Sequence, residues 1–76
     1  MMFPDRETVR RIREQYPAGT RVELVRMEDV FAPAPGTKGT VLGTDDAGDL
    51  LMRWDNGSGL NVIYGEDIVR NVEETP

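Results

Sequence analysis

The spacing of the apolar residues changes once along this chain, at Pro17. Before that proline, Val9, Ile12 and Tyr16 lie three and then four residues apart, which is the spacing of one face of an α-helix. After it, apolar and polar residues alternate, which is the period of a half-buried β-strand. The pattern therefore predicts one helix, over residues 4–16, followed by a segment made only of β-strands.

Five short strands are expected in that segment. They are predicted over residues 20–26, 37–43, 50–54, 60–63 and 68–72. Pro33 and Pro35 cannot lie in a central strand, so we expect a long loop between the first two strands. Asn56-Gly57 indicates a tight hairpin turn. Gly39 and Gly43 lie inside the second strand, where they predict a bend or a bulge.

The number and order of these strands indicate a barrel. A sheet of five short strands buries its apolar face best when it curls on itself, and closure also removes the exposed edges. The predicted fold class is mainly β with one N-terminal α-helix: a small SH3-like five-stranded antiparallel barrel over residues 20–72, with the helix against an open end or flank. The 76 residues are expected to form a single domain, 1–76, with a frayed tail at 73–76.

Composition argues against common enzyme chemistry. The chain contains no cysteine and no histidine, so it lacks thiolates and imidazoles as nucleophiles, bases or metal ligands. The carboxylates Asp45, Asp46 and Asp49 lie close together, but their spacing does not fit a calcium-binding EF-hand loop. We expect no enzymatic activity, no cofactor and no bound metal.

The chain also lacks the usual signs of export or membrane insertion. No apolar run approaches the roughly 18 residues of a membrane span, and the first residues do not resemble a secretory signal. Small secreted domains of this size usually need disulfides. We therefore expect a cytoplasmic protein with no membrane partner. Its net charge of −5 disfavours, without excluding, a nucleic-acid partner.

Four short stretches carry a resemblance to a known family. They are YPAGTRVEL (16–24), PGTKGTV (35–41), RWDNGS (53–58) and GED (65–67). Together they resemble an uncharacterised family, a domain of unknown function, of small proteins common in bacteriophages and mobile elements. The resemblance implies an SH3-like fold and a phage or mobile-element origin. It implies no activity and no catalytic residues.

The function that the residues favour is protein binding through the long loop and the adjoining face of the barrel. In that loop, Phe31 follows the acidic pair Glu28-Asp29 and precedes Pro-Ala-Pro. An exposed aromatic on a semi-rigid loop is a typical protein contact, although Phe31 is equally consistent with packing down as a plug of the barrel. Trp54 and Tyr64 complete the candidate surface. The alternation around Trp54 favours core packing for that side chain.

Three other functions stay open. The first is a phage inhibitor of a host enzyme or defence complex, acting by acidic mimicry of a nucleic acid. The second is nucleic-acid binding like that of KOW-type barrels, through helix arginines that Glu7 and Glu14 partly neutralise; these arginines are Arg6, Arg10, Arg11 and Arg13. The third is capture of a small molecule between copies of the chain. The identity of the partner and the oligomeric state are not predicted.

Overall fold

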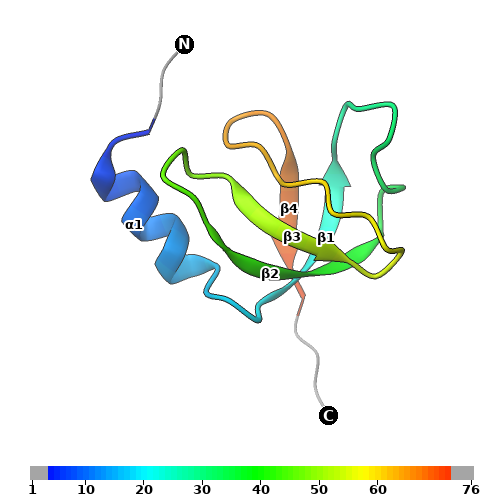
Figure 1. Cartoon of the computed structure of the whole chain (residues 1–76), viewed down its shortest axis with the longest axis horizontal. Coiled ribbons are helices and arrows are strands. Elements are labelled where there is room, and N and C mark those ends of the chain that lie inside the picture. Colours follow the sequence, from blue (N-terminus) through cyan, green and yellow to red (C-terminus); the bar gives the residue numbers. More distant parts are fainter. Residues whose placement is uncertain (1–3, 73–76) are drawn as a thin grey trace.

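The computed structural model describes residues 4–72 and contains one helix and one sheet (Figure 1). The elements are α1 (Arg6–Gln15), β1 (Arg21–Arg26), β2 (Lys38–Thr44), β3 (Leu50–Trp54) and β4 (Ile68–Asn71). The four strands form an antiparallel sheet in the order β3-β2-β1-β4. The prediction of a mainly β chain with one N-terminal helix is confirmed. The predicted frayed tail at 73–76 lies outside the described residues.

Hydrogen bonds close to each end of helix α1 define where it begins and ends. The carboxylate of Asp5 accepts a hydrogen bond from the amide of Thr8 at 2.8 Å, which satisfies one of the free amides of the first turn. That bond lowers the pKa of Asp5 below its ordinary value. At the other end, the amide of Tyr16 donates to the carbonyl of Ile12 at 2.8 Å, and Pro17 follows.

The core contains Trp54, which is only 1% exposed. Its buried apolar residues are Val22, Leu24, Val41, Leu50, Met52, Trp54 and Val62, with Ile12 of α1 and Tyr16 at the end of the helix packed against them. Gly39 allows the indole to approach β2, since a Cβ there would lie 2.7 Å from a Trp54 ring carbon. The bulge expected in this strand is present between Val41 and Gly43.

The predicted closed five-stranded barrel is wrong, because the sheet within residues 4–72 has four strands and does not close. Residues 60–63 were expected to form a strand, but they pair with β3 only through an isolated bridge between Leu50 and Val62. Backbone direction alternates along a strand, so Tyr64 is the next residue after Val62 whose amide faces β3, and that amide is occupied. The carboxylate of Asp67 accepts from the amide of Ile63, and that of Asp49 accepts from the amide of Tyr64, both at 2.8 Å.

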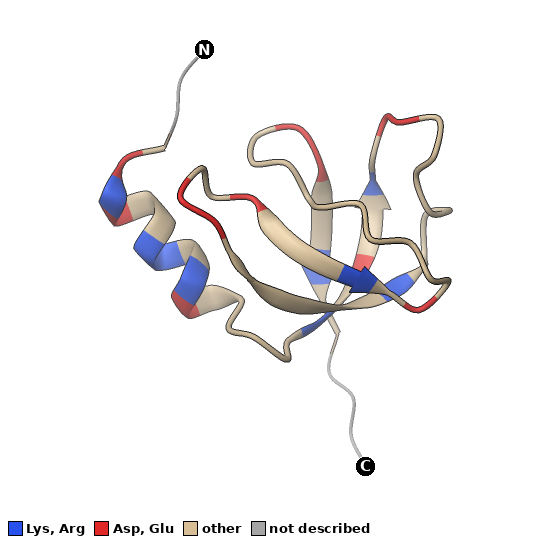
Figure 2. Cartoon of the chain, viewed as in Figure 1, with Lys and Arg blue, Asp and Glu red and all other residues tan. Residues whose placement is uncertain are grey.

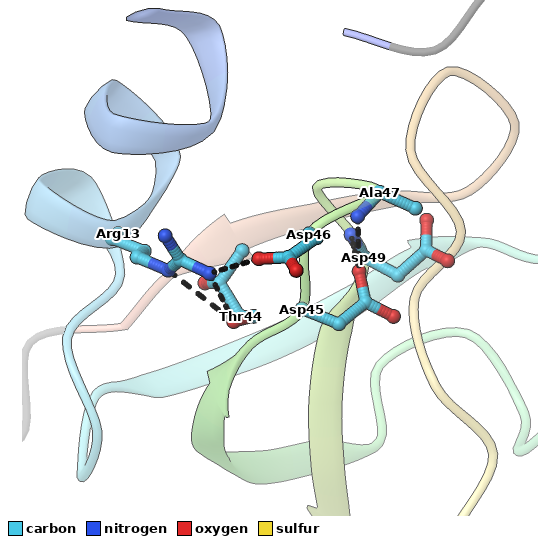
Figure 3. A network of polar contacts seen from close by, with 6 residues as sticks. All are labelled: Arg13, Thr44, Asp45, Asp46, Ala47 and Asp49. Atoms are coloured by element: carbon cyan, nitrogen blue, oxygen red, sulfur yellow. Dashed lines mark hydrogen bonds and ion pairs between the residues drawn. The ribbon is translucent and has the colours of Figure 1, made fainter. Parts of the chain in front are cut away.

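Helix α1 lies beside the sheet and contacts the loop between β2 and β3 (Figures 1 and 3). Arg13 donates to the carbonyl of Thr44 at 3.2 and 3.3 Å and to the carboxylate of Asp46 at 3.1 Å. Gly48 in this loop has a φ of 82°, and a Cβ there would lie 3.1 Å from Pro4 and 3.2 Å from Ile12. Glycine is therefore required for the loop to accept the helix.

Candidate functional site

Residues of the helix region, of β3 and of β4 line an apolar depression of about 210 Å³, which we call the seam groove. It lies between the start of β4 on one side and β3 with residues 62–65 on the other, and α1 contributes to its wall. Its lining residues are Ile12, Tyr16, Gly48, Leu50, Val62, Ile63, Tyr64, Gly65, Asp67, Ile68 and Val69.

Three large apolar side chains that line the seam groove are exposed to solvent. Ile63 is 38% exposed, Tyr64 44% and Ile68 48%. Single exposed apolar side chains are ordinary in small proteins, but several that line one concave surface indicate a binding site. Of the predicted binding residues, Tyr64 is therefore placed in this groove.

A second, acidic depression adjoins the seam groove and shares Ile63 and Asp67 with it. We call it the acidic hollow; its volume is about 310 Å³, and it is lined by Met27, Glu28, Asp29, Leu60, Asn61, Ile63, Glu66 and Asp67. Figure 2 shows acidic residues on the loops at this end of the sheet. Glu66 forms no ion pair within residues 4–72, whereas Glu28 is paired with Arg26. The hydrogen bond from Arg26 lowers the pKa of Glu28, so this carboxylate stays ionised.

The acidic cluster between β2 and β3 serves the architecture of its own turn. Asp45 accepts hydrogen bonds from the amides of Ala47 and Asp49 at 3.0 and 2.9 Å (Figure 3). Asp49 in turn binds the amide of Tyr64, and Asp46 pairs with Arg13. No group of three potential metal-ligating side chains is present among residues 4–72. These carboxylates mostly bind groups of the protein itself. This weakens the hypothesis that they imitate the phosphates of a nucleic acid.

Phe31 lies on the surface, at 79% exposure, so of its two interpretations the exposed one holds and packing down as a plug is wrong. Hydrogen bonds hold the tip of its loop. Its amide donates to the carboxylate of Asp29 at 2.8 Å, and the amide of Ala32 donates to the Asp29 carbonyl at 3.0 Å. At the base, the amide of Gly36 donates to the Leu24 carbonyl at 2.8 Å. The loop therefore presents an aromatic side chain on a hydrogen-bonded turn next to the acidic hollow.

Trp54 does not contribute to a surface. Its indole nitrogen donates to the carbonyl of Leu60 at 2.8 Å, and its ring is enclosed by the core. The two interpretations of this residue are thereby resolved in favour of core packing, and Trp54 is removed from the candidate binding residues. The physical reason is its position on the inward face of β3, in phase with Leu50 and Met52.

Two of the four helix arginines are held in ion pairs. Arg10 is shared between Glu7 and Glu14, and Arg13 is held by the loop after β2. Arg6 and Arg11 form no ion pair within the part of the chain that the structure describes. Half of the predicted cations are therefore already neutralised, which reduces the phosphate contacts that the helix offers.

The two edges of the sheet differ in their backbone hydrogen bonds. At β3, residues 58–62 cover the edge: Leu50 and Val62 exchange two bonds of 2.9 Å, and the amide of Trp54 donates to Ser58 at 3.0 Å. At β4, the Val72 amide donates to the carbonyl of Arg21, toward β1. Backbone direction alternates along a strand, so the amides of Val69 and Asn71 face away from β1.

Most of the seam groove was not predicted. Of its lining residues only Tyr64 was selected from the sequence, because the others come from α1, β3, β4 and the segment before β4. One signal was present: Ile63-Tyr64 places two large apolar residues directly before a Gly-Glu-Asp turn.

No helix within residues 4–72 has the length and apolar character to cross a membrane.

A comparison with protein families places the chain. The model of DUF4314, described as a domain of unknown function, matches residues 5–72, and the chain belongs to this family. The resemblance to an uncharacterised domain family is thus confirmed. No curated protein and no solved structure gives a significant match.

Proposed function

We propose that this member of the DUF4314 family is a non-enzymatic protein-binding module. Its binding surface is the seam groove, the acidic hollow beside it and the exposed Phe31 of the neighbouring loop. The observation that carries the proposal is the continuity of these parts, since the groove and the hollow share Ile63 and Asp67. Apolar contacts would provide affinity, and the carboxylates would select a partner with basic residues.

The composition supports the non-enzymatic part of the proposal. With neither cysteine nor histidine in the chain, the groove offers only Tyr16, Tyr64 and Asp67 as polar side chains. The carboxylate of Asp67 already accepts a hydrogen bond from the amide of Ile63. A cytoplasmic location and a phage or mobile-element origin belong to the same proposal; the first is supported by the absence of cysteine and the second by the sequence resemblance alone.

The experiment compares two exposed residues of equal exposure on different faces. Ile68 lines the seam groove and is 48% exposed, whereas Leu42 on β2 is 49% exposed and lines neither the groove nor the hollow. The wild-type chain, Ile68→Lys and Leu42→Lys are immobilised separately and exposed to lysate of cells that carry the gene. Proteins retained by each are quantified by mass spectrometry, and circular dichroism checks that both variants fold.

The expected result is a partner that wild type and Leu42→Lys retain equally and Ile68→Lys loses by about tenfold or more, the effect of placing a charge in an apolar contact. Retention that is unaffected by Ile68→Lys, or that falls equally in both folded variants, contradicts the proposed surface.

A further inference from the structure

The β4 edge offers hydrogen-bonding groups that the rest of the described chain does not use. The amides and carbonyls of Val69 and Asn71 that face away from β1 form no hydrogen bond within residues 4–72. An exposed strand edge of this kind is a template for pairing with another extended segment. By contrast, the β3 edge is already paired with residues 58–62. Of the two outer strands, β4 is therefore the one open to an added strand.

The seam groove lies directly beside this edge. Val69 and Ile68 of β4 form one wall, and Ile63 and Tyr64 form the opposite one. Because side chains alternate between the two faces of a strand, a segment added to β4 would direct every second side chain toward the groove. Apolar residues at those positions would cover the exposed parts of Ile63, Tyr64 and Ile68.

The charges beside the edge restrict the partner further. Asp67 and Glu66 precede β4, and the acidic hollow adds Asp29, whereas its Glu28 is paired with Arg26. The basic residue of β4, Arg70, is bound to Glu23 on β1 at 3.1 Å, so it does not oppose the carboxylates as a free cation. A segment with lysine or arginine between its apolar residues would therefore be attracted to this edge, whereas an acidic one would be repelled.

We propose that β4 accepts an extended peptide segment of a partner protein, with alternating apolar and basic residues, as an added antiparallel or parallel strand. Its apolar side chains occupy the seam groove, and its backbone binds Val69 and Asn71. This inference rests on the proposed protein-binding function and specifies its mode. It makes the partner segment the strand that the open barrel lacks.

The test uses a synthetic peptide of six residues that alternates lysine and valine, with both ends blocked. Hydrogen exchange of individual amides is followed by NMR in the full chain, with and without saturating peptide. The amides of Val69 and Asn71 are expected to exchange at least about tenfold more slowly with the peptide, because they gain a hydrogen-bond partner. The amide of Val72, which is already bonded to Arg21, serves as the internal control.

Backbone methylation of the peptide separates strand pairing from side-chain binding. In an extended strand, the amides of all valines lie on one edge and those of all lysines on the other. Methylation of one set is expected to weaken binding at least about tenfold, whereas methylation of the other set leaves it unchanged. A peptide that alternates glutamate and valine is expected to bind at least tenfold more weakly than the lysine peptide at low salt.

The outcomes distinguish this inference from the function on which it rests. Binding that shifts Ile63 and Tyr64 but leaves exchange at Val69 and Asn71 unchanged overturns strand addition and retains the groove as a binding site. Equal effects of the two methylations, or no binding of the lysine peptide, also overturn it, while the lysate comparison decides the proposed function separately. Slow exchange at both amides in a dimer of the chain alone would assign the edge to a second copy.

Discussion

The two edges of the sheet differ in whether another segment of the chain covers them. At β3, residues 58–62 return along the strand and satisfy its backbone, and Trp54 fastens this segment by donating to Leu60. At β4, no segment within residues 4–72 covers the outer edge of the strand in this way. The pairing with β3 stops at Tyr64, where the carboxylate of Asp49 occupies the amide that would continue it, and Asp67 holds the neighbouring amide of Ile63. These two carboxylates thus turn residues 63–64 away from strand pairing.

The largest expected effect concerns the covered edge. Trp54→Ala removes the centre of the core and the bond to Leu60, and we expect a loss of about 3–5 kcal/mol in the free energy of unfolding. Since small domains have a total stability of about 5–15 kcal/mol, the variant should be largely unfolded at 25 °C if the chain lies at the low end of that range. Circular dichroism with urea titration measures this effect.

Tyr64→Ala is the matched control for the open side. Tyr64 is 44% exposed in the seam groove, so its truncation should cost less than about 1 kcal/mol, as surface substitutions do. Equal losses for Trp54→Ala and Tyr64→Ala would mean that the groove wall is part of the core, and the contrast between the two edges would fail.

The second effect concerns Asp67, whose carboxylate accepts a hydrogen bond from the amide of Ile63. Asp67→Ala removes the acceptor of the Ile63 amide, and we expect a loss of about 1 kcal/mol, the net contribution of one hydrogen bond. The amide of Ile63 should also exchange faster, and NMR hydrogen exchange measures it directly. Asp67→Asn keeps an acceptor oxygen and should recover most of both effects. Unchanged exchange at Ile63 in Asp67→Ala would show that this carboxylate does not hold the amide of Ile63.

Local signals in the sequence predicted the elements better than their closure. The helical spacing of Val9, Ile12 and Tyr16, the cap at Asp5 and the turn at Asn56-Gly57 each depend on neighbours a few residues away, and each is present. Closure depends instead on Asp49 binding Tyr64, which is 15 residues distant. Alternation gives no information on such a contact, so residues 60–63 were expected to be a strand.

The candidate site was predicted less completely for a similar reason. Apolar alternation identifies Trp54 as inward-facing, but it gives no rule for Phe31, because a loop residue has no periodic partner that defines its inner face. The seam groove combines Ile12 with Ile63 and Ile68, residues that become neighbours only after the helix docks on Gly48. Only the tertiary arrangement therefore reveals it.

A smaller effect tests the charge of the open edge. Glu66→Gln removes one carboxylate of the acidic hollow, and binding of the lysine–valine peptide should weaken about twofold to fivefold at low salt, as for one exposed charge pair. Glu14→Gln, on α1 and away from the groove, should leave the affinity unchanged. The difference should shrink at higher ionic strength, which isothermal titration calorimetry at two salt concentrations measures. A larger effect of Glu14→Gln would locate the peptide on the helix.

The smallest effect concerns an ion pair next to the covered edge. Arg21 binds Asp55, directly after β3, through two hydrogen bonds of 2.8 and 2.5 Å, and these bonds lower the pKa of Asp55 in the folded state. A carboxylate with a lowered folded-state pKa stabilises the fold above its unfolded pKa, near 4, and this contribution disappears as the pH falls through the folded value. Thermal unfolding between pH 6 and pH 2 should therefore show a smaller acid-induced decrease of Tm in Asp55→Asn than in wild type. Glu66→Gln, which alters a carboxylate with no ion pair in residues 4–72, should retain the wild-type decrease of Tm. Identical profiles for all three proteins would show that the ion pair between Arg21 and Asp55 adds no acid-sensitive stability.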